Sequence, residues 1–398
     1  MKLFGWKSAG RAPARPALLR GRGSWISGAW PRSYEAQLRE LYLSNAVAQR
    51  AVRLVAEGLA SAPLSASDPA ALALVEAISG GQALLETVAT QLLLHGNAYV
   101  ELLPGTGPKP AELYALRPER VSIEPDARGW PRAFVYRAGE AATRLAPDQL
   151  IHIRTHHPLD DHYGLGCLDA AAGAMAAHNA ATRWNKALLD NAARPSGALV
   201  AEGGETLSAD QFARLQAEME ASFSGAGNAG RPMLLEGGLR WQSLSFSPAD
   251  MDFAGLKAAA AREIALAFGV PPMLLGLPGD ATYANYREAN RALWRQAILP
   301  LAGKILSALA EGLQPWFAGL TLSVDLDRVT ALSEDRERLW AQVSAADFLT
   351  VEEKRNLIGF APLAPAGGDG DGPNSAPVAA HPPTPDPSRE REGRGDRQ

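Results

Sequence analysis

Apolar residues recur every three or four positions over the most strongly patterned part of the chain, residues 253–313. Leu256, Ile264 and Phe268 share one side of a predicted helix, with alanines between them. Gly269 and the two prolines that follow it end this helix, because glycine favours a left-handed helix end and proline cannot continue the ladder. The start of the stretch therefore predicts one amphipathic helix.

A loop and a second helix follow in the same stretch. Leu277–Tyr286 contains glycine, proline, aspartate and asparagine, which are typical of turns, so we expect a mobile loop. From Tyr286 to Leu309 the apolar spacing returns and predicts a long helix. Pro300 lies inside it and removes one backbone hydrogen bond, so we expect a kink there. The stretch predicts two helices joined by a mobile tip.

The first part of the chain combines helical spacing with a period of two. Helical spacing predicts helices at 41–59, with Ser44 as the N-cap, at 68–78 and at 82–95. The period then changes to two, and glycine and proline separate short strands. The predicted strands are 98–103, 112–116, 121–124, 133–137 and 150–154. Together these elements predict an α+β domain with a largely antiparallel sheet.

A small α/β unit separates two long helices in the middle of the chain. Leu165–Ala193 is rich in small residues and predicts a long helix that ends before Pro195. The helix of 253–268 follows the small unit and returns the chain toward the first domain. The elements predicted for the unit are a strand at 197–201, a helix from Ser208 to Phe223, and strands at 232–236 and 239–246.

The C-terminal part predicts one strand, two helices and a tail. Residues 321–326 alternate as a strand, and Ser333 and Thr350 each begin a helix. Asp335 places negative charge in the first turn of the helix at Ser333, where it suits the helix dipole. Residues 364–398 have almost no apolar content and predict a disordered tail.

Charge and cysteine content narrow the function classes. The net charge of the 398 residues is −4, which argues against a general polyanion binder. Residues 1–32 are an exception, because their arginines and lysines form a basic arm that we expect to be flexible or docked on a partner. The single cysteine, Cys167, excludes an intrachain disulfide and a thiolate zinc cage. The composition fits an intracellular globular protein. The longest apolar runs are far shorter than the about 18 residues of a membrane span, so we expect no membrane span.

Two groups of residues could carry metal chemistry. Asp325 and Asp327 have the spacing of one face of a predicted strand, as nuclease carboxylates do. Neither group has the spacing of a known metal motif, and no phosphate-binding or hydrolase motif occurs. We therefore expect no catalytic residue, no metal and no cofactor. The alternative is a metal-dependent nuclease or another DNA-processing enzyme of a mobile element. The other group is His152, His156, His157, Asp160, Asp161 and His162.

Three stretches of the sequence resemble the portal proteins of tailed bacteriophages and of phage-derived gene transfer agents. They are FGVPPMLLGLPGDATYANYREANRALWRQAILPL at 268–301, LLLHGNAYVEL at 92–102 and YGLG at 163–166. In element order the resemblance extends over residues 30–360. It implies the α+β phage portal fold of lambda-like siphophages and a subunit that forms rings.

The resemblance also divides the chain into the parts of a portal subunit. These are a wing, a stem of two helices that flank a small clip, a tunnel loop with a kinked tunnel helix, and a short helical crown. The implied boundaries are the arm 1–32, wing 33–163, stem helix 164–195, clip 196–247, second stem helix 248–269, tunnel loop region 270–286, tunnel helix and return strand 287–332, crown 333–363 and tail 364–398.

A structural rather than enzymatic function follows from the resemblance. It implies a dodecameric ring at one capsid vertex, which forms the channel for DNA packaging and exit. The implied partners are other copies of the chain, the major capsid protein, the head–tail adaptor, the terminase large subunit and double-stranded DNA without sequence specificity. The implied location is a virion or gene transfer agent particle assembled in the host cytoplasm. A small adaptor or scaffold of low oligomeric state is a further alternative.

Residues that face the channel or a neighbouring subunit are implied in the same way. Ala172 and Met175 fall on the apolar stripe of the first stem helix and are expected at the subunit interface. The residues expected to face the channel are Asp280, Thr282, Tyr283, Asn285 and Tyr286.

Three arginines of the implied tunnel helix leave alternatives open. Arg287, Arg291 and Arg295 are four residues apart and share one side of the helix, ahead of the kink at Pro300. They are suited to a solvated face, to contact with DNA, or to pairing with glutamates of a neighbouring subunit. The sequence alone does not rank these three.

Overall fold

The computed structural model describes residues 33–190, 197–201, 208–223, 239–243, 253–277 and 282–359. The chain divides into two compact units, residues 1–336 and residues 337–398. The predicted arm and tail, and the strand predicted at 232–236, lie outside the described residues.

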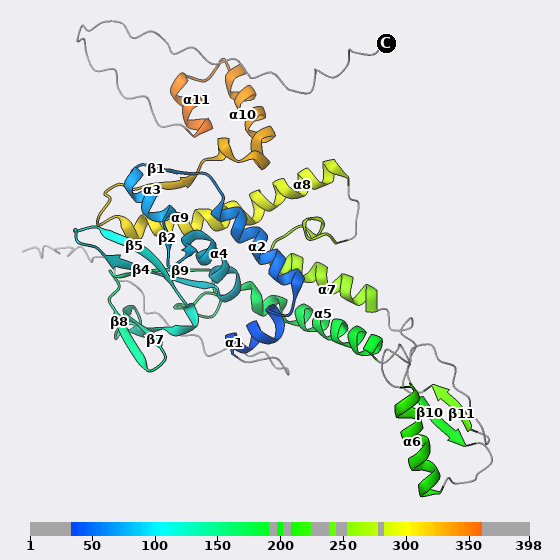
Figure 1. Cartoon of the computed structure of the whole chain (residues 1–398). Helices are drawn as coiled ribbons and strands as arrows, with labels where there is room; N and C mark the ends of the chain where they lie inside the picture. The colour runs from blue at the N-terminus through cyan, green and yellow to red at the C-terminus, as the bar shows by residue number, and fades with distance from the viewer. Residues whose placement is uncertain are drawn as a thin grey trace, which may run out of the picture. The chain divides into compact units, whose positions relative to one another are not determined.

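Helices come first in the main unit (Figure 1). The predicted helix at 41–59 begins later than expected, because Asn45 and not Ser44 is its N-cap. The Asn45 side chain accepts from Ala48 N at 2.9 Å, whereas the Ser44 hydroxyl donates back to Glu40 O. The helices are α1 (Tyr34–Gln37), the π-helical η1 (Leu38–Tyr42), α2 (Ala46–Ala60), α3 (Pro69–Glu76) and α4 (Leu84–His95).

The two largest sheets of this unit are three-stranded, in the orders β5–β4–β9 and β6–β7–β8, and the other described sheets are two-stranded. Every strand pair among the described residues is antiparallel, so the predicted sheet type is confirmed there. Strand β8 was not predicted, because four of its five residues are exposed and its sequence AATRL lacks alternation. The strands are β4 (Asn97–Pro104), β5 (Pro110–Leu116), β6 (Val121–Pro125), β7 (Pro131–Ala138), β8 (Ala141–Leu145) and β9 (Leu150–Arg154).

The main core lies where α2, α4 and α9 (Leu299–Leu313) pack beside the β5–β4–β9 sheet (Figure 1). Val55 of α2, Val88 of α4 and Ile305 of α9 have no exposed surface. A second, smaller cluster joins Tyr99 to Phe134 and to the other inward residues of the β6–β7–β8 sheet. Apolar burial on both sides of β4 therefore makes this strand the centre of the unit.

Two stretches singled out in the sequence, around residues 92–102 and 163–166, meet in space. Gly96 ends α4 with φ 79°, and a Cβ built there would lie 2.4 Å from the carbonyl carbon of Leu165. Asn97 Oδ1 accepts from Gly164 N at 2.8 Å, and Gly96 O accepts from Thr155 N at 2.9 Å. This close approach requires glycine and fixes the start of the long helix that follows.

That long helix, α5 (Cys167–Asp190), pairs with α7 (Phe253–Ala267). The rings of Trp184 and Phe253 stack at a centroid distance of 5.9 Å. Between these helices the chain forms β10 (Gly197–Ala201), α6 (Ala209–Phe223) and β11 (Leu239–Ser243), with β10 antiparallel to β11. The predicted pattern of helix, small α/β unit and helix is therefore present in the described residues.

After α7 come a short 3-10 helix, η4 (Pro272–Leu275), and a continuous helical stretch of α8 (Tyr283–Leu293), the π-helical η5 (Trp294–Ile298) and α9. Strand β12 (Leu322–Val324) then pairs with β1 (Leu64–Ala66). The two 3-10 helices η6 (Leu326–Arg328) and η7 (Thr330–Leu332) lead to α10 (Ser333–Ala345) and α11 (Val351–Ile358). None of the described helices has both the length and the apolar content to cross a membrane.

The second unit, taken by itself, contains most of α10 and all of α11. Thr350 begins α11 with a reciprocal capping box, in which Thr350 and Glu353 each accept from the other's backbone. Lys354 Nζ donates to Ser344 O at 3.2 Å and ties α11 to the end of α10. The predicted helices at Ser333 and Thr350 are confirmed.

Candidate functional site

Helix α8 carries most of the residues expected to face the channel. Its N-cap is Thr282, whose hydroxyl accepts from Asn285 N at 3.2 Å, so the helix begins at Tyr283. Tyr283, Asn285 and Tyr286 therefore lie in the first turns of a helix, not in the loop predicted for 277–286. Asp280 lies outside the described residues. The Thr282 cap explains the difference, because a capping hydroxyl stabilises a helix that the Gly/Pro content of the preceding residues did not favour.

The first turns of α8 are exposed. Every residue from 282 to 288 is exposed. The Tyr283 side chain is 79% exposed and Tyr286 is 53% exposed. Arg287 Cζ lies 5.5 Å from the Tyr283 ring centroid, within the range of a cation–π contact. This end of α8 thus presents two tyrosines and an arginine to the solvent.

The helix changes its hydrogen-bond pattern just before Pro300. Residues Trp294–Ile298 are π-helical, and Leu299 N donates to Trp294 O. Pro300 then occupies the first turn of α9, where its missing N–H costs least. The irregularity predicted at Pro300 is therefore a π-helical segment on its N-terminal side, and π-helical segments are common causes of helix kinks.

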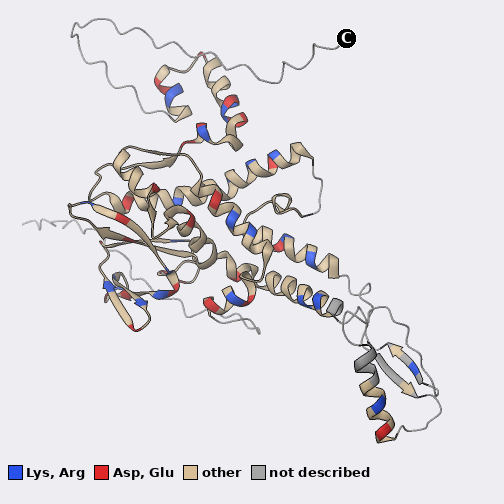
Figure 2. Cartoon of the chain, in the orientation of Figure 1, with Lys and Arg blue, Asp and Glu red and all other residues tan. Residues whose placement is uncertain are grey.

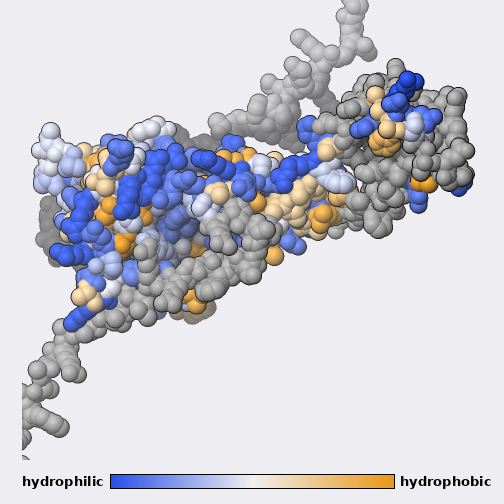
Figure 3. Space-filling view, turned by 90° about the horizontal axis from the view of Figure 1, so that it is seen from below, coloured by the Kyte–Doolittle hydropathy of each residue, from blue (hydrophilic) through white to orange (hydrophobic). Residues whose placement is uncertain are grey.

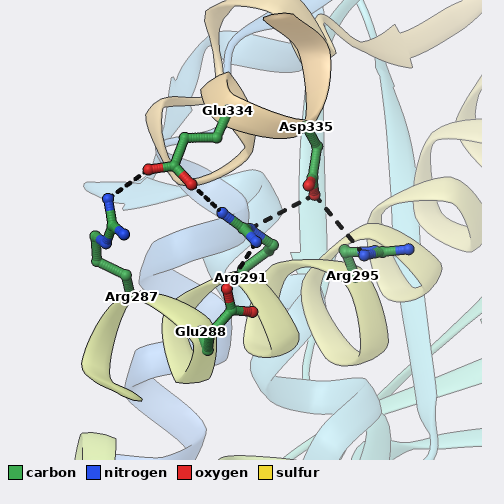
Figure 4. A network of polar contacts seen from close by, with 6 residues as sticks. All are labelled: Arg287, Glu288, Arg291, Arg295, Glu334 and Asp335. Atoms are coloured by element: carbon green, nitrogen blue, oxygen red, sulfur yellow. Dashed lines mark hydrogen bonds and ion pairs between the residues drawn. The ribbon is translucent and has the colours of Figure 1, made fainter. Parts of the chain in front are cut away.

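Arg287, Arg291 and Arg295 pair with acidic residues of the same subunit (Figure 4). Glu334, in the first turn of α10, pairs with Arg287 and accepts from Arg291 Nη2 at 2.7 Å. Arg291 Nη1 also donates to Glu288 Oε1 at 2.8 Å, within α8. These pairs are formed inside one chain, and the sequence did not suggest such partners. Contact with DNA or with a neighbouring subunit stays a prediction.

Asp335 completes this group, which we call the arginine clasp: Arg287, Glu288, Arg291, Arg295, Glu334 and Asp335. Asp335 Oδ2 lies 3.6 Å from Arg291 Nε and 3.7 Å from Arg295 Nη1. The Arg291 side chain is only 11% exposed, against 50% for Arg287 and 64% for Arg295. Burial lowers the pKa of Arg291, but its hydrogen bond to Glu334 and the nearby carboxylates outweigh this, so its pKa is raised.

The clasp has three positive and three negative side chains, so its charges balance. Both basic and acidic residues occur along the described ribbon (Figure 2). Sequence reasoning missed Glu334 as a partner and assigned Asp335 to the helix dipole. The sequence did show two acidic residues at the start of a helix. Acidic residues are common at that position in any helix, so they did not indicate a pairing with the arginines.

The two residues expected at the stem interface lie elsewhere. Met175 has no exposed surface and Ala172 is 5% exposed, and both belong to the main core of the subunit itself. The prediction that they face a neighbouring subunit is therefore wrong for this pair. Helical spacing located the apolar side of α5 correctly, but it could not say that η1, α4 and α7 of the same chain cover it.

Other residues of these paired helices remain exposed. Ala180 and Trp184 of α5 are exposed, as are Leu256 and Leu266 of α7. In the view of Figure 3, apolar residues gather along the part of the surface where α5 runs. This exposed side, and not the Met175 side, is available to another molecule.

Three of the candidates in the histidine and aspartate group, His152, Asp160 and His162, make structural contacts. His152 stacks on Tyr99 at 4.4 Å between ring centroids, and its Nε2 donates to Asn97 Oδ1 at 3.1 Å. Burial lowers the pKa of His152 to about 3, so it is neutral near pH 7. His162 is also buried and bonds through Nε2 to Gly129 O. Asp160 Oδ1 accepts from the backbone N–H groups of residues 162 and 163.

Asp325 and Asp327 do not lie side by side on a strand. Strand β12 ends at Val324, and the Asp325 side chain caps the 3-10 helix η6 by accepting from Asp327 N at 3.2 Å. The Asp327 carboxylate pairs with Arg336. No group of three or more His, Cys, Asp or Glu residues within the described ranges is arranged to hold a metal ion.

Comparisons with known proteins agree with this architecture. The family model described as phage portal protein matches residues 46–359. A chain in the virion of a native gene transfer agent particle, and in the neck of that particle with C12 symmetry, is 47% identical and superimposes with a TM-score of 0.65. That match covers 86% of this chain and 97% of the other.

Two further proteins extend the comparison. An uncharacterized protein of Rickettsia felis is 43% identical over 290 residues, which is 70% of this chain and 73% of that protein. An HK97-family phage portal protein from Corynebacterium diphtheriae has the same fold, with a TM-score of 0.56 at 19% identity over 75% of this chain and 96% of that one. With most of its length matched by the family model, the chain belongs to the phage portal protein family.

Proposed function

We propose that this chain is the subunit of a portal ring in a gene transfer agent or related phage particle. Twelve copies form a closed ring at one vertex of the capsid, and DNA enters and leaves through its centre. One observation carries this proposal. This chain is 47% identical to a chain in the neck of a gene transfer agent particle with C12 symmetry, and the match covers 97% of that chain.

A closed ring suits the exposed surfaces of the paired helices α5 and α7. In a ring each subunit uses one surface to bind the next, and no copy is left with a free end. Trp184 is 48% exposed and Leu256 is 46% exposed, so both can bury apolar area on a neighbouring copy. These residues replace Ala172 and Met175 as the proposed stem interface.

The bore of such a ring must let DNA slide. Each phosphate that a protein neutralises adds affinity, so a bore lined by unpaired arginines would hold the duplex. In the clasp, Arg291 and its neighbours are matched by carboxylates of the same chain. Tyr283 and Tyr286 remain exposed at the end of α8 and can press on a duplex without reading its bases.

The parts of the subunit keep the boundaries set out from the sequence. The wing at 33–163 contacts the major capsid protein, and the clip at 196–247 contacts the head–tail adaptor and the terminase large subunit. The tunnel loop region at 270–286, which includes η4 and the first residues of α8, narrows the bore, and the crown at 333–363 follows the return strand. The subunit works by geometry rather than by catalysis. Four of the nuclease candidates, His152, Asp160, His162 and Asp325, make structural contacts, which supports this function.

Electron microscopy of the purified full-length chain tests the proposal. We expect negative-stain class averages to show rings with an axial channel and twelvefold symmetry, and light scattering to give the corresponding mass. A monomer or low oligomer without a channel contradicts the ring and favours an adaptor or scaffold. DNA cleavage that depends on a divalent metal favours the nuclease alternative.

A further inference from the structure

Helix α8 lacks the apolar contacts that hold the rest of the main unit. Of its eleven residues, all of them described, only Leu293 is buried. Isolated helices of this length are marginal in water, so α8 needs another source of support. The support visible in the structure comes from charge, through the arginine clasp.

Arg291 is the centre of that clasp. It is the least exposed of the three arginines, at 11%, and contacts Glu288, Glu334 and Asp335. A guanidinium at such a site is costly unless its charge is matched, and removing one partner of a buried pair leaves the other uncompensated. The geometry of α8 against the first turn of α10 is therefore set chiefly at this side chain.

The junction between α8 and α9 is the part of this helical stretch that can bend. Ile298 is 1% exposed and anchors the end of the π-helical segment in the core, and the side chains of α9 beyond it are buried. The segment Trp294–Ile298 separates this fixed part from α8 and carries a hydrogen-bond pattern less stable than that of an α-helix. Movement of α8 can be absorbed there without disturbing α9.

We propose that Arg291 is a positioning residue that fixes the direction of α8 through Glu334 and Asp335. The exposed end of α8 then follows any displacement of the first turn of α10, and the π-helical segment acts as the hinge. The inference rests on the proposed function in one respect, since it is the portal ring that places Tyr283 and Tyr286 in the bore. In that setting α10 sets the width of the bore.

Hydrogen exchange of the full-length protein, read by mass spectrometry, tests this role. Arg291→Gln should speed exchange in peptides of α8 by about tenfold or more, the loss expected for hydrogen bonds to charged groups. Peptides of α9 should keep their wild-type rates. Arg53→Gln is the matched control, because Arg53 pairs with Glu57 on an exposed face of α2 at 2.9 Å; it should leave α8 unchanged.

A second variant approaches the clasp from the acidic side. The double change Glu334→Gln and Asp335→Asn should reproduce the fast exchange of α8, and adding Arg291→Gln to it should have little further effect, because both remove the same contacts. Additive effects in the triple variant overturn the proposal. So does exchange of α8 within about twofold of wild type, or equal acceleration in α9, which is general destabilisation.

The same samples separate this inference from the proposed function. Negative-stain images of the wild type that show no rings contradict the portal ring, whereas the response of α8 to Arg291→Gln still tests the clasp. Rings with unchanged exchange in α8 contradict the clasp and leave the ring intact.

Discussion

The two ends of one continuous helical stretch, α8 and α9, are held by different forces. Six of the fifteen residues of α9 are buried, among them Ile305 and Leu309 with no exposed surface. Of the eleven residues of α8, only Leu293 is buried, and ion pairs to Glu334 and Asp335 replace the missing apolar contacts. The stabilisation from apolar burial does not depend on the direction of the contacts, whereas the strength of an ion pair depends on where its two charged groups lie.

This difference indicates which part of the helix is framework and which part can be moved. A segment fixed by apolar burial shifts only when the core repacks, at a cost of several kcal/mol. A segment fixed by a few charged groups moves when those groups move. In the portal ring that we propose, the movable segment is the one nearest the DNA.

The largest expected effect tests whether α5 belongs to the framework. Met175→Asp places an unpaired carboxylate where no surface is exposed, so we expect a loss of about 4 kcal/mol or more in the free energy of unfolding. Ala180→Asp, on the exposed side of the same helix, should cost less than about 1 kcal/mol. Thermal and denaturant unfolding measure both, and similar losses in the two variants would contradict the burial of Met175.

A second pair of variants compares α9 with α8 directly. Leu309→Ala removes a fully buried side chain of α9 and should cost about 2 to 5 kcal/mol, because the cavity it leaves cannot fully close. Tyr286→Ala in α8 should stay within about 0.5 kcal/mol, since that side chain is 53% exposed. Urea unfolding of the two variants checks the contrast, and a large loss for Tyr286→Ala would mean that α8 is also held by apolar burial.

The smallest expected effect is a change in the pH dependence of stability, and it comes from His152, which is buried in its neutral form. Burial lowers the pKa of His152 from 6.5 to about 3, so between these values the unfolded chain binds a proton that the folded chain does not. The free energy of unfolding should therefore fall as pH falls through this window, by about 1 kcal/mol per pH unit from this residue. His152→Gln keeps a donor for Asn97 without titrating.

The test of this residue is the difference between two slopes. Chemical unfolding at several pH values between about 6 and 4 should give a shallower decrease for His152→Gln than for the wild type. Parallel slopes would show that His152 does not remain neutral in the folded chain.

Much of the fold could be predicted because its signals are local. The cap at Asp68 and the capping box at Thr350 fixed helix starts to within a residue, and the change of period after His95 located the strands. Strand β8 escaped prediction because an exposed edge strand need not alternate. Asn45 displaced Ser44 as a cap because Asn179 of α5 orients its amide, a contact between residues far apart in sequence.

The candidate site was less predictable, for a related reason. The spacing of Arg287, Arg291 and Arg295 gave their common side correctly, but spacing says nothing about which carboxylates lie opposite. Glu334 is far away in sequence and reaches Arg291 only after the chain has passed through α9 and β12. Helical periodicity likewise found the apolar side of α5 without showing which helices cover it, so Met175 was assigned to the wrong surface.

Strand β1 has a consequence for the order in which the chain can fold during synthesis. Leu64–Ala66 finds its partner in Leu322–Val324, and Thr321 N donates to Ser67 Oγ across the same junction. At a synthesis rate of about 5 to 20 residues per second, the ribosome needs roughly 13 to 50 s to make the intervening chain. During that time β1 has an open edge and α9 is absent from the core, so the unit can close only near the end of translation. A chain that stops before Leu322 therefore leaves β1 without its partner.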